Sequence, residues 1–353
     1  MRSFWNGLIS RPVASFTLLV AGTGLALAQS SEPEVGLINR DAAVYNKASG
    51  KVYIVDPAHS SVSIILPSGA AVSVKVGSGP VSIGISNRTG MVYVVNSGSH
   101  SVSVIDGKSN AVIATVPTPA RSYAVAVDED ANKVYVSNTF SNLLTVIDGA
   151  TNTATNLKTG SADAIVVDSD RHRVYQLGYE SDTLTELDPT TGATTKIAAG
   201  AMHQWGLLRA GKNLYVSHIQ DANIAAIDLD THAIRTLPTG AMPCALAINE
   251  KTGQLYVASY SAGTVTIVDN DAVTATVEVA PHPQAIAVDP DKSLLYVASP
   301  QQNAVTIIDI RSHRVLKTLK SADQPYAITV NPITHAAYSA NLGNPPFTSL
   351  GKP

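Results

Sequence analysis

Six side chains with binding chemistry interrupt a sequence that is otherwise rich in small and aliphatic residues. They are Arg121, Tyr123, Asp163, His203, Trp205 and His282. Arginine, aspartate and histidine supply charge and hydrogen bonds, whereas tyrosine and tryptophan supply flat apolar surfaces that carry one polar atom. Together these residue types predict a small polar pocket with an aromatic wall. The alternative is structural: His203 is a solvated loop histidine, and Trp205 fills a packing gap.

An internal repeat defines the elements that position these residues. An apolar residue followed by tyrosine recurs every 40 to 42 residues. The repeated tyrosines are Tyr53, Tyr93, Tyr135, Tyr175, Tyr215, Tyr256, Tyr296 and Tyr338. Within each repeat, four short runs rich in Val, Ile and Thr alternate with turn-forming residues, and no segment has a sustained helical period. Four short strands in every repeat of this length indicate a β-propeller blade.

The repeat count predicts an all-β chain that folds as a single propeller of four-stranded blades. Seven repeats are complete, and two further strands follow near residues 326–340. Residues 347–350 align with a third strand, and residues 34–39 occupy the place of the strand before the first repeat. One blade built from both termini would remove the exposed sheet edges. We therefore favour eight blades within residues 29–353, closed by the two termini; seven blades plus a hairpin is the alternative.

The N-terminus has the features of a secretory signal. Arg2 and Arg11 are followed by an apolar stretch, and Ala26-Leu27-Ala28 forms a small-x-small cleavage motif before Gln29. The stretch is shorter than the roughly 20 residues of a membrane span. We predict a signal peptide over residues 1–28 and a mature chain, without a transmembrane segment, in the periplasm or secreted. An uncleaved membrane anchor is the alternative.

Composition narrows the classes of partner. The chain is 45% apolar and 14% charged, with a net charge of −3 that becomes more negative when Arg2 and Arg11 are removed. No basic run remains, which argues against nucleic acid as a partner. Cys244 is the single cysteine, so the chain forms no internal disulfide and carries no covalent c-type haem. Closure of every sheet edge favours a monomer.

The repeat resembles the YVTN-family β-propeller repeat. Met91–Asn96 and Lys133–Asn138 carry variants of its core motif, Val-Tyr-Val-x-Asn. The flanking pattern, Pro-x-x-Ile-Ala-Val-Asp-Pro before the motif and Val-x-Val-Ile-Asp after it, matches over residues 41–340. The resemblance implies a loosely defined binding or scaffold role, because propellers host many functions.

The propeller pattern also predicts where a site would lie. Loops before the inner strands, and loops joining second to third strands, share one face around the channel mouth, and the six residues above all fall there. His59 and His100 hold nearly matching loop positions, but turn residues dominate that position and we predict no metal site. The aspartates that end the third strands, such as Asp106 and Asp188, are expected to cap turns.

No convergent catalytic set emerges from the sequence. It contains no Gly-x-Ser-x-Gly elbow, P-loop, His-Glu-x-x-His motif or dinucleotide fingerprint. The leading hypothesis is an exported, non-catalytic binding or scaffold protein of the bacterial cell envelope, with no cofactor and with an unidentified protein or small molecule at the mouth. The alternatives are a lactonase-type propeller, using Asp163, Arg121 and His203, and a subunit of a periplasmic redox complex.

Overall fold

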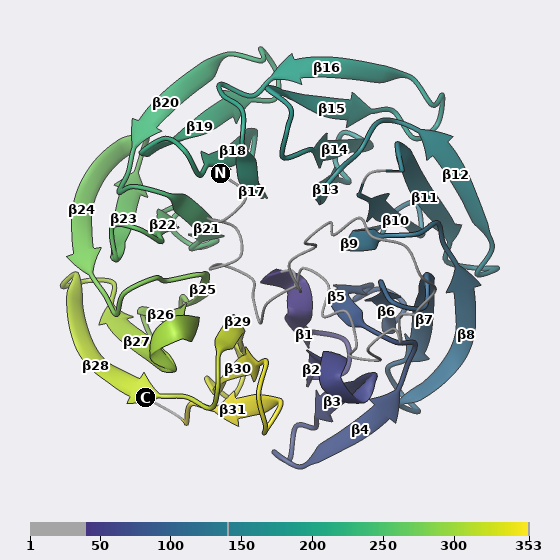
Figure 1. The fold of residues 1–353 in the computed structure, drawn as a ribbon, viewed down its shortest axis with the longest axis horizontal. Coiled ribbons are helices and arrows are strands. Elements are labelled where there is room, and N and C mark those ends of the chain that lie inside the picture. The colour runs from purple at the N-terminus through teal and green to yellow at the C-terminus, as the bar shows by residue number, and fades with distance from the viewer. Residues whose placement is uncertain (1–39, 140, 352–353) are drawn as a thin grey trace, which may run out of the picture.

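The computed structural model describes residues 40–139 and 141–351, and within them the chain forms eight antiparallel sheets around a central axis (Figure 1). Seven sheets have four strands and the eighth has three. Consecutive strands pair with each other, from the axis outward, in every sheet. The predicted eight-bladed, all-β propeller is therefore confirmed. We number the blades 1 to 8 in chain order.

The strands of the first four blades follow one another with short connections. Blade 1 contains β1 (Ala43–Asn46), β2 (Lys51–Asp56), β3 (Ser61–Ile65) and β4 (Ala71–Lys75). Blade 2 contains β5 (Pro80–Ile85), β6 (Met91–Asn96), β7 (Ser101–Asp106) and β8 (Ala111–Pro117). Blade 3 contains β9 (Ser122–Asp128), β10 (Lys133–Asn138), β11 (Leu143–Asp148) and β12 (Ala154–Lys158). Blade 4 contains β13 (Ala164–Asp168), β14 (Arg173–Leu177), β15 (Thr183–Leu187) and β16 (Thr194–Ala198).

The second half of the ring repeats this order. Blade 5 contains β17 (Gln204–Ala210), β18 (Asn213–His218), β19 (Asn223–Asp228) and β20 (Ile234–Pro238). Blade 6 contains β21 (Pro243–Ile248), β22 (Leu255–Ser259), β23 (Thr264–Asp269) and β24 (Ala272–Glu278). Blade 7 contains β25 (Ala285–Asp289), β26 (Leu294–Ser299), β27 (Ala304–Asp309) and β28 (Arg314–Lys320). Blade 8 contains β29 (Pro325–Val330), β30 (Ala337–Asn341) and β31 (Phe347–Ser349). Short 3-10 helices occur at η1 (Arg40–Ala42), η2 (Pro57–His59) and η3 (Pro300–Gln302).

The repeated tyrosines lie at the centre of the second strands, between neighbouring blades. Tyr93 stands opposite Gly84 on the inner strand and Val104 on the third strand, and it has no exposed surface. Inner strands crowd toward the axis: a Cβ added at Gly84 would lie 2.9 Å from a methyl group of Val125 in the next blade. The outer strands are exposed, as in β4 and β12. Large apolar side chains thus fill the layers between blades, and small ones line the centre.

Blade 8 packs against blade 1 and completes the ring. Residues 347–349 form β31, which pairs with β30. The Tyr326 hydroxyl lies 3.4 Å from the carbonyl of Val55 in blade 1, and Ala327 packs in one apolar cluster with Ile54. The predicted closing strand at residues 34–39 and the predicted signal peptide at residues 1–28 lie outside the described residues.

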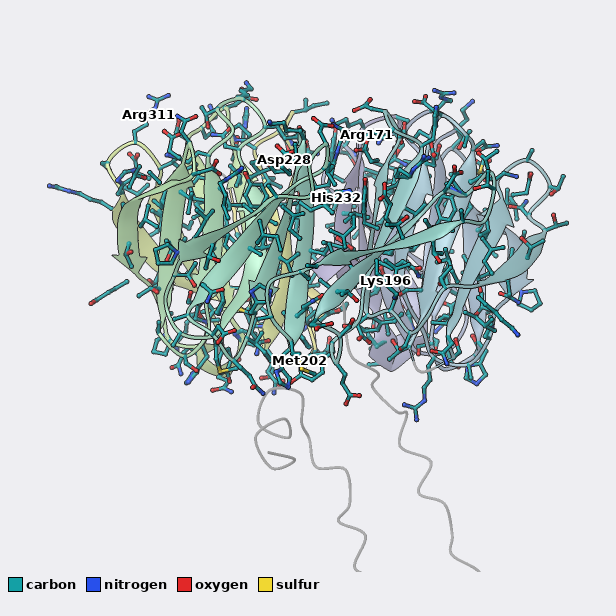
Figure 2. All side chains as sticks on the ribbon, turned by 90° about the horizontal axis from the view of Figure 1, so that it is seen from above. Arg171, Lys196, Met202, Asp228, His232 and Arg311 are labelled. Carbon is teal, nitrogen blue, oxygen red and sulfur yellow. The ribbon has the colours of Figure 1, made fainter. Side chains whose placement is uncertain are left out.

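The two faces of the ring differ in their connections. Hairpin turns within the inner and outer strand pairs form one face, which we call the turn face; Arg171, Asp228, His232 and Arg311 lie there (Figure 2). Met202 lies on the opposite face, which carries the crossovers into the inner strands and which we call the mouth face. Over the residues that the structure describes, no helix is long and apolar enough to cross a bilayer.

The aspartates at the ends of the third strands are turn caps. The Asp148 carboxylate accepts hydrogen bonds from the backbone N–H groups of Ala150 and Thr151. The Lys133 ammonium, 2.6 Å away, together with these two donors lowers the pKa of Asp148 to about 2. Asp106, Asp188, Asp228 and Asp309 accept equivalent backbone bonds. These carboxylates stabilise the scaffold and take no part in the mouth.

Candidate functional site

The crossovers on the mouth face, which lead from one blade into the inner strand of the next, share one backbone conformation. Arg121, His203 and His282 adopt left-handed conformations with φ of 64°, 59° and 59°. The carbonyl of Arg121 accepts a hydrogen bond from Thr139 N at 2.9 Å, and that of His203 accepts one from Ile219 N at 3.1 Å. Each bond ties a crossover to the loop between the second and third strands of its own blade. Non-glycine residues adopt this conformation at a cost of roughly 1 kcal/mol or more, so these bonds support a strained rim.

The next feature inward is a β-bulge that recurs where the inner strands begin. In five blades the pairing of the inner strand with the second strand shifts by one residue near its first residues. A bulge bends the strand and re-aims the side chain of the extra residue. The residues at this repeat position, which we call the mouth ring, are Asp41, Val81, Tyr123, Asp163, Trp205, Cys244, Gln284 and Tyr326.

Blade 5 corrects one detail of the sequence alignment. The repeat spacing places Gln204 in the mouth ring, but the register sets Leu208 opposite Tyr215 and so places Trp205 there. The reason is the inner hairpin: only Gly211 and Lys212 join β17 to β18, whereas four residues, 129–132, join β9 to β10. Because this turn is short, the residue at the mouth-ring position of blade 5 is Trp205, one residue after the Gln204 that the sequence alignment predicts.

Three ring residues converge on one side of the mouth. Tyr123 comes from blade 3, Asp163 from blade 4 and Asp41 from the start of blade 1. Burial raises the pKa of the Tyr123 phenol, and the negative charges of Asp163 and Asp41 raise it further. Tyr123 is therefore protonated at neutral pH and can donate a hydrogen bond at the mouth.

Asp163 and His203 meet through Tyr179. The Asp163 carboxylate accepts a hydrogen bond from Tyr179 N at 2.8 Å, and the Tyr179 ring lies edge-on to the His203 ring with 5.2 Å between centroids. Burial raises the pKa of the Asp163 carboxyl; the bonds from Tyr179 and Thr139 lower it in part, and the Glu180 charge raises it. This group joins a carboxylate, a phenol and an imidazole across blades 4 and 5.

A second aromatic–imidazole pair occurs two blades further around the ring. Tyr260 of blade 6 packs against His282 of blade 7, with 4.7 Å between ring centroids. Tyr260 occupies the same repeat position as Tyr179, and His282 the same position as His203. The Nδ1 atom of His282 is buried without a hydrogen-bond partner. Beside this pair, burial raises the pKa of the Cys244 thiol to about 12, so the thiol stays protonated.

The structure thus places four of the six predicted residues in two groups on the mouth face. Tyr123, Asp163 and His203 are linked in blades 3 to 5, whereas His282 belongs to the pair with Tyr260. Trp205 is the second residue of β17 and is half-buried, and Arg121 is exposed on the rim of blade 3. Their role in binding stays a prediction.

Sequence reasoning did not select Tyr179 and Tyr260, although their positions were visible in the repeat. Both follow a repeat tyrosine by four residues, and each faces the crossover histidine of the next blade. Pairing these two repeat positions would have found them. Within residues 40–139 and 141–351, no three His, Cys, Asp or Glu side chains are arranged to hold a metal ion.

Comparisons with known proteins support the propeller fold but assign the chain to no family. No protein-family model and no curated protein matches this sequence, so membership of the YVTN family stays a prediction. Among solved structures, the chain is similar to the dihydro-heme d1 dehydrogenase NirN in complex with DHE, with a TM-score of 0.73 and 16% identity over 88% of this chain and 72% of that one. It is also similar to hydrazine synthase from Kuenenia stuttgartiensis, with a TM-score of 0.59 and 16% identity over 93% of this chain and 99% of that one. Identities this low show the shared propeller alone.

Proposed function

We propose that this chain is an exported, non-catalytic binding protein of the bacterial cell envelope, whose ligand or partner docks at the mouth face. One observation carries the proposal. The scaffold positions of the repeat hold nearly the same residue in each blade, whereas the mouth ring holds acids, phenols, an indole, a thiol and an amide. Chemically diverse residues at one rim position, beside nearly constant scaffold positions, are typical of a site grafted on a fold.

The pairs Tyr179–His203 and Tyr260–His282 also favour a binding site on the mouth face. They offer aromatic surfaces with hydrogen-bonding edges, which binding sites favour because such side chains lose little conformational entropy. On the turn face, several charged groups are paired with one another: Arg209 with Asp168 at 3.0 Å, and Arg171 with Asp230 at 2.7 Å. The mouth face, by contrast, includes the buried Nδ1 atom of His282, which has no hydrogen-bond partner.

Affinity capture from a bacterial envelope fraction tests this function. Immobilised protein should retain a component that is lost when His203→Asn and Trp205→Ala are combined. His313→Asn is the matched control, because His313 has the same left-handed conformation, with φ of 55°, but lies in a turn between β27 and β28. Asparagine tolerates that conformation, so both variants should fold. Equal capture by all three proteins would contradict a mouth site.

The second candidate is a subunit of a periplasmic redox complex. It is favoured by the two mouth imidazoles together with the likeness to a dehydrogenase solved with DHE. Titration with haemin distinguishes it: a haem-binding mouth should shift the absorption spectrum of haemin, and His203→Asn and His282→Asn should each reduce the shift. A haemin spectrum that the protein leaves unchanged would remove this candidate.

The lactonase alternative is tested by turnover. Asp163 and His203 each contact Tyr179, and among the described residues no hydrogen bond joins the Asp163 carboxylate to the His203 imidazole as in a catalytic pair. We expect no hydrolysis of a panel of sugar lactones by the purified protein. Hydrolysis that Asp163→Asn abolishes would overturn the non-catalytic proposal.

A further inference from the structure

The outer rim of the propeller is interrupted at blade 8. Each of blades 1 to 7 ends in a fourth, outermost strand, and these strands follow one another around the rim (Figure 1). Blade 8 ends at its third strand, β31, which has only three residues. Between β28 of blade 7 and β4 of blade 1, the described part of the chain therefore supplies no outer strand, and the edge of β31 lies open.

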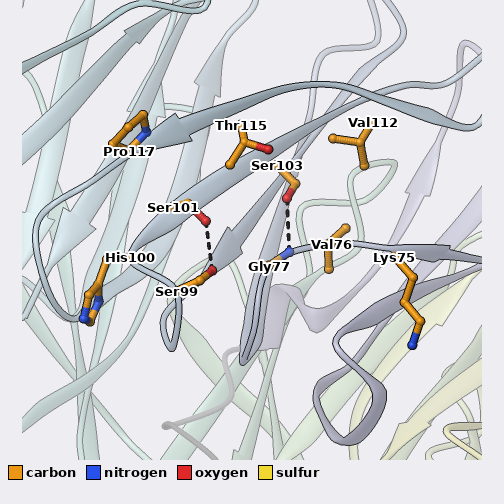
Figure 3. A pocket seen from close by; sticks show the side chains of 10 residues that line it. All are labelled: Lys75, Val76, Gly77, Ser99, His100, Ser101, Ser103, Val112, Thr115 and Pro117. Atoms are coloured by element: carbon orange, nitrogen blue, oxygen red, sulfur yellow. Dashed lines mark hydrogen bonds between the residues drawn. The ribbon is translucent and has the colours of Figure 1, made fainter.

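In blades 1 to 7, the outer strand covers one aliphatic side chain of the third strand. This side chain follows the repeat tyrosine by nine positions, has no exposed surface, and stands opposite an aliphatic residue of the outer strand. The pairs are Val62–Val74, Val102–Val116, Leu144–Leu157, Leu184–Ile197, Ile224–Leu237, Val265–Val277 and Val305–Leu319. Figure 3, a close view of the hollow between blades 1 and 2, shows the neighbours of one such pair: Thr115 and Pro117 of β8 opposite Ser103 and Ser101 of β7.

Phe347 of β31 lacks this cover. It follows Tyr338 by nine positions and so takes the place of Val62 and its equivalents. Phe347 packs beside the apolar cluster that joins blades 8 and 1, but it is only half-buried, whereas each of its seven equivalents is fully buried. Exposed apolar surface is unfavourable in water, and an open strand edge is a template for another strand. The edge of β31 thus offers a docking strand both backbone groups and an apolar side chain.

The spacing of the crossovers indicates which segment fits this edge. In blades 1 to 7, the covering aliphatic residue precedes the mouth-ring residue of the next blade by six to eight positions: six in blade 3, eight in blade 4 and seven in the others. The mouth-ring residue of blade 1 is Asp41. The residues six to eight positions before it are Val35, Glu34 and Pro33, and only Val35 is aliphatic.

The charges of this segment complement those of the neighbouring outer strand. β28 carries Arg314, Lys317 and Lys320, all exposed, whereas no other outer strand has more than one basic residue. Consecutive outer strands contact one another, as β24 and β28 do, so a strand in the gap would lie beside these cations. Glu32 and Glu34 precede Val35. Surface ion pairs add little stability each, but they favour an acidic segment over a basic one.

We propose that residues 32–36 of this chain dock on β31 as the fourth strand of blade 8, with Val35 covering Phe347. The register of blade 1, in which Val74 faces Val62 and Ser73 faces Ser63, then sets Glu34 opposite Thr348. The proline in this segment is compatible with an outer edge strand. The segment precedes the first blade and pairs with the last, so it joins the two by backbone hydrogen bonds. This inference does not depend on the function proposed above.

Melting curves of the purified protein test the contact. Val35→Ser should lower the melting temperature by roughly 2 °C or more. In a protein that already carries Phe347→Ala, the same substitution should have almost no further effect, because its partner is gone. Leu37→Ser is the matched control, since Leu37 is aliphatic but lies four positions before Asp41. No effect of Val35→Ser, an equal effect of Leu37→Ser, or full additivity with Phe347→Ala would overturn the proposal.

Disulfide trapping locates the segment. Glu34→Cys combined with Thr348→Cys should form a disulfide within one chain on oxidation, because directly opposite residues of paired strands bring their Cβ atoms to about 4.5 to 5.5 Å. Leu37→Cys combined with Thr348→Cys is the control and should stay reduced. Melting curves confirm that each variant folds, and mass spectrometry of digested protein identifies the linked peptides. A link between two chains would assign the edge to a second copy, and this result, no link, or equal linkage in the control would refute the proposed docking.

Discussion

At the mouth, burial of the Asp163 carboxyl makes the folded protein less stable when this group is charged. The carboxyl is half-buried between Thr139 and Tyr179, and burial raises its pKa even though both neighbours donate to it. The folded chain therefore binds this proton more tightly than the unfolded chain does. The resulting contribution to stability is present below the ordinary aspartate pKa and is lost as the pH rises through the raised value.

This sign gives a pH-dependent prediction. Asp163→Asn should raise the melting temperature at about pH 7, where the wild-type carboxylate is charged, and should leave it nearly unchanged at about pH 3, where the carboxyl is neutral in both states. Melting curves across this range measure the difference. Asp182→Asn, at an exposed neighbouring position, should show no such trend. A difference independent of pH would contradict burial as the cause.

Gln176 is the most unusual buried side chain of the scaffold. It is 3% exposed, and neither its amide nitrogen nor its amide oxygen has a hydrogen-bond partner. Five other blades have valine at this position after the repeat tyrosine, among them Val136 and Val216. A buried amide without partners is destabilising, because it loses its hydrogen bonds to water without replacing them.

Replacing this side chain should therefore stabilise the protein. We expect Gln176→Val to increase the free energy of unfolding by about 1 to 3 kcal/mol, measured by urea denaturation. The reciprocal variant Val216→Gln, at the equivalent buried position of blade 5, should destabilise the protein by a similar amount. A loss of stability in Gln176→Val would show that the amide has a partner in solution.

At the scale of elements, the turn face joins neighbouring blades through their inner hairpins. Arg209 at the end of β17 reaches the buried Asp168 of blade 4 at 3.0 Å. His335, in the hairpin of blade 8, reaches the buried Asp289 of blade 7 at 2.9 Å. Asp168 and Asp289 have no exposed surface. The partner from the next blade adds to bonds within each blade: Asp168 also accepts from Arg171, and Asp289 from two backbone N–H groups of its own hairpin.

The seam between blades 7 and 8 offers a direct test. His335→Asn keeps a residue that tolerates the left-handed φ of 58° and removes the imidazole from Asp289. We expect it to lower the free energy of unfolding by about 1 to 3 kcal/mol, because the buried Asp289 carboxylate loses one of its hydrogen-bond partners. His313→Asn, with the same conformation in the turn after β27, should have little effect in the same denaturation assay. Equal effects would assign the loss to backbone strain.

At the scale of the molecule, a ring of separate sheets depends on the contact between its first and last blades. Blade 8 meets blade 1 through Ala327 and the Tyr326 hydroxyl, while its third strand comes from the C-terminal segment. Leu350, just after that strand, is 8% exposed and packs in the core between blades 7 and 8. The segment therefore supports the last blade against both neighbours.

Two C-terminal truncations test whether β31 and Leu350 stabilise the ring, or whether any shortening of the chain lowers its stability. A chain ending at residue 345 lacks β31 and Leu350, and its melting temperature should fall by roughly 5 °C or more, because several buried contacts and a strand pairing are lost. A chain ending at residue 350 keeps them and should melt like the full chain. Similar melting of the two truncated proteins would show that β31 contributes nothing to closure.

The fold could be predicted from the sequence because its signals are local. The buried tyrosines such as Tyr93 recur with a fixed period, and the capping aspartates such as Asp148 lie where a turn needs them. The predicted site residues could be assigned to one face of the ring, but the sequence could not show which of them are in contact. The register in blade 5 depends on the short turn at Gly211, which moved Trp205 into the place expected for Gln204.

The sequence by itself determined the number and order of the blades and the face on which the unusual residues gather, because hydrophobic alternation and turn residues act within one repeat. Only the tertiary structure decided which of these residues meet. The contact of Tyr179 with His203 and the effect of Asp41 and Asp163 on Tyr123 both join different blades. Such contacts depend on how one sheet packs against the next, and no single repeat encodes that packing.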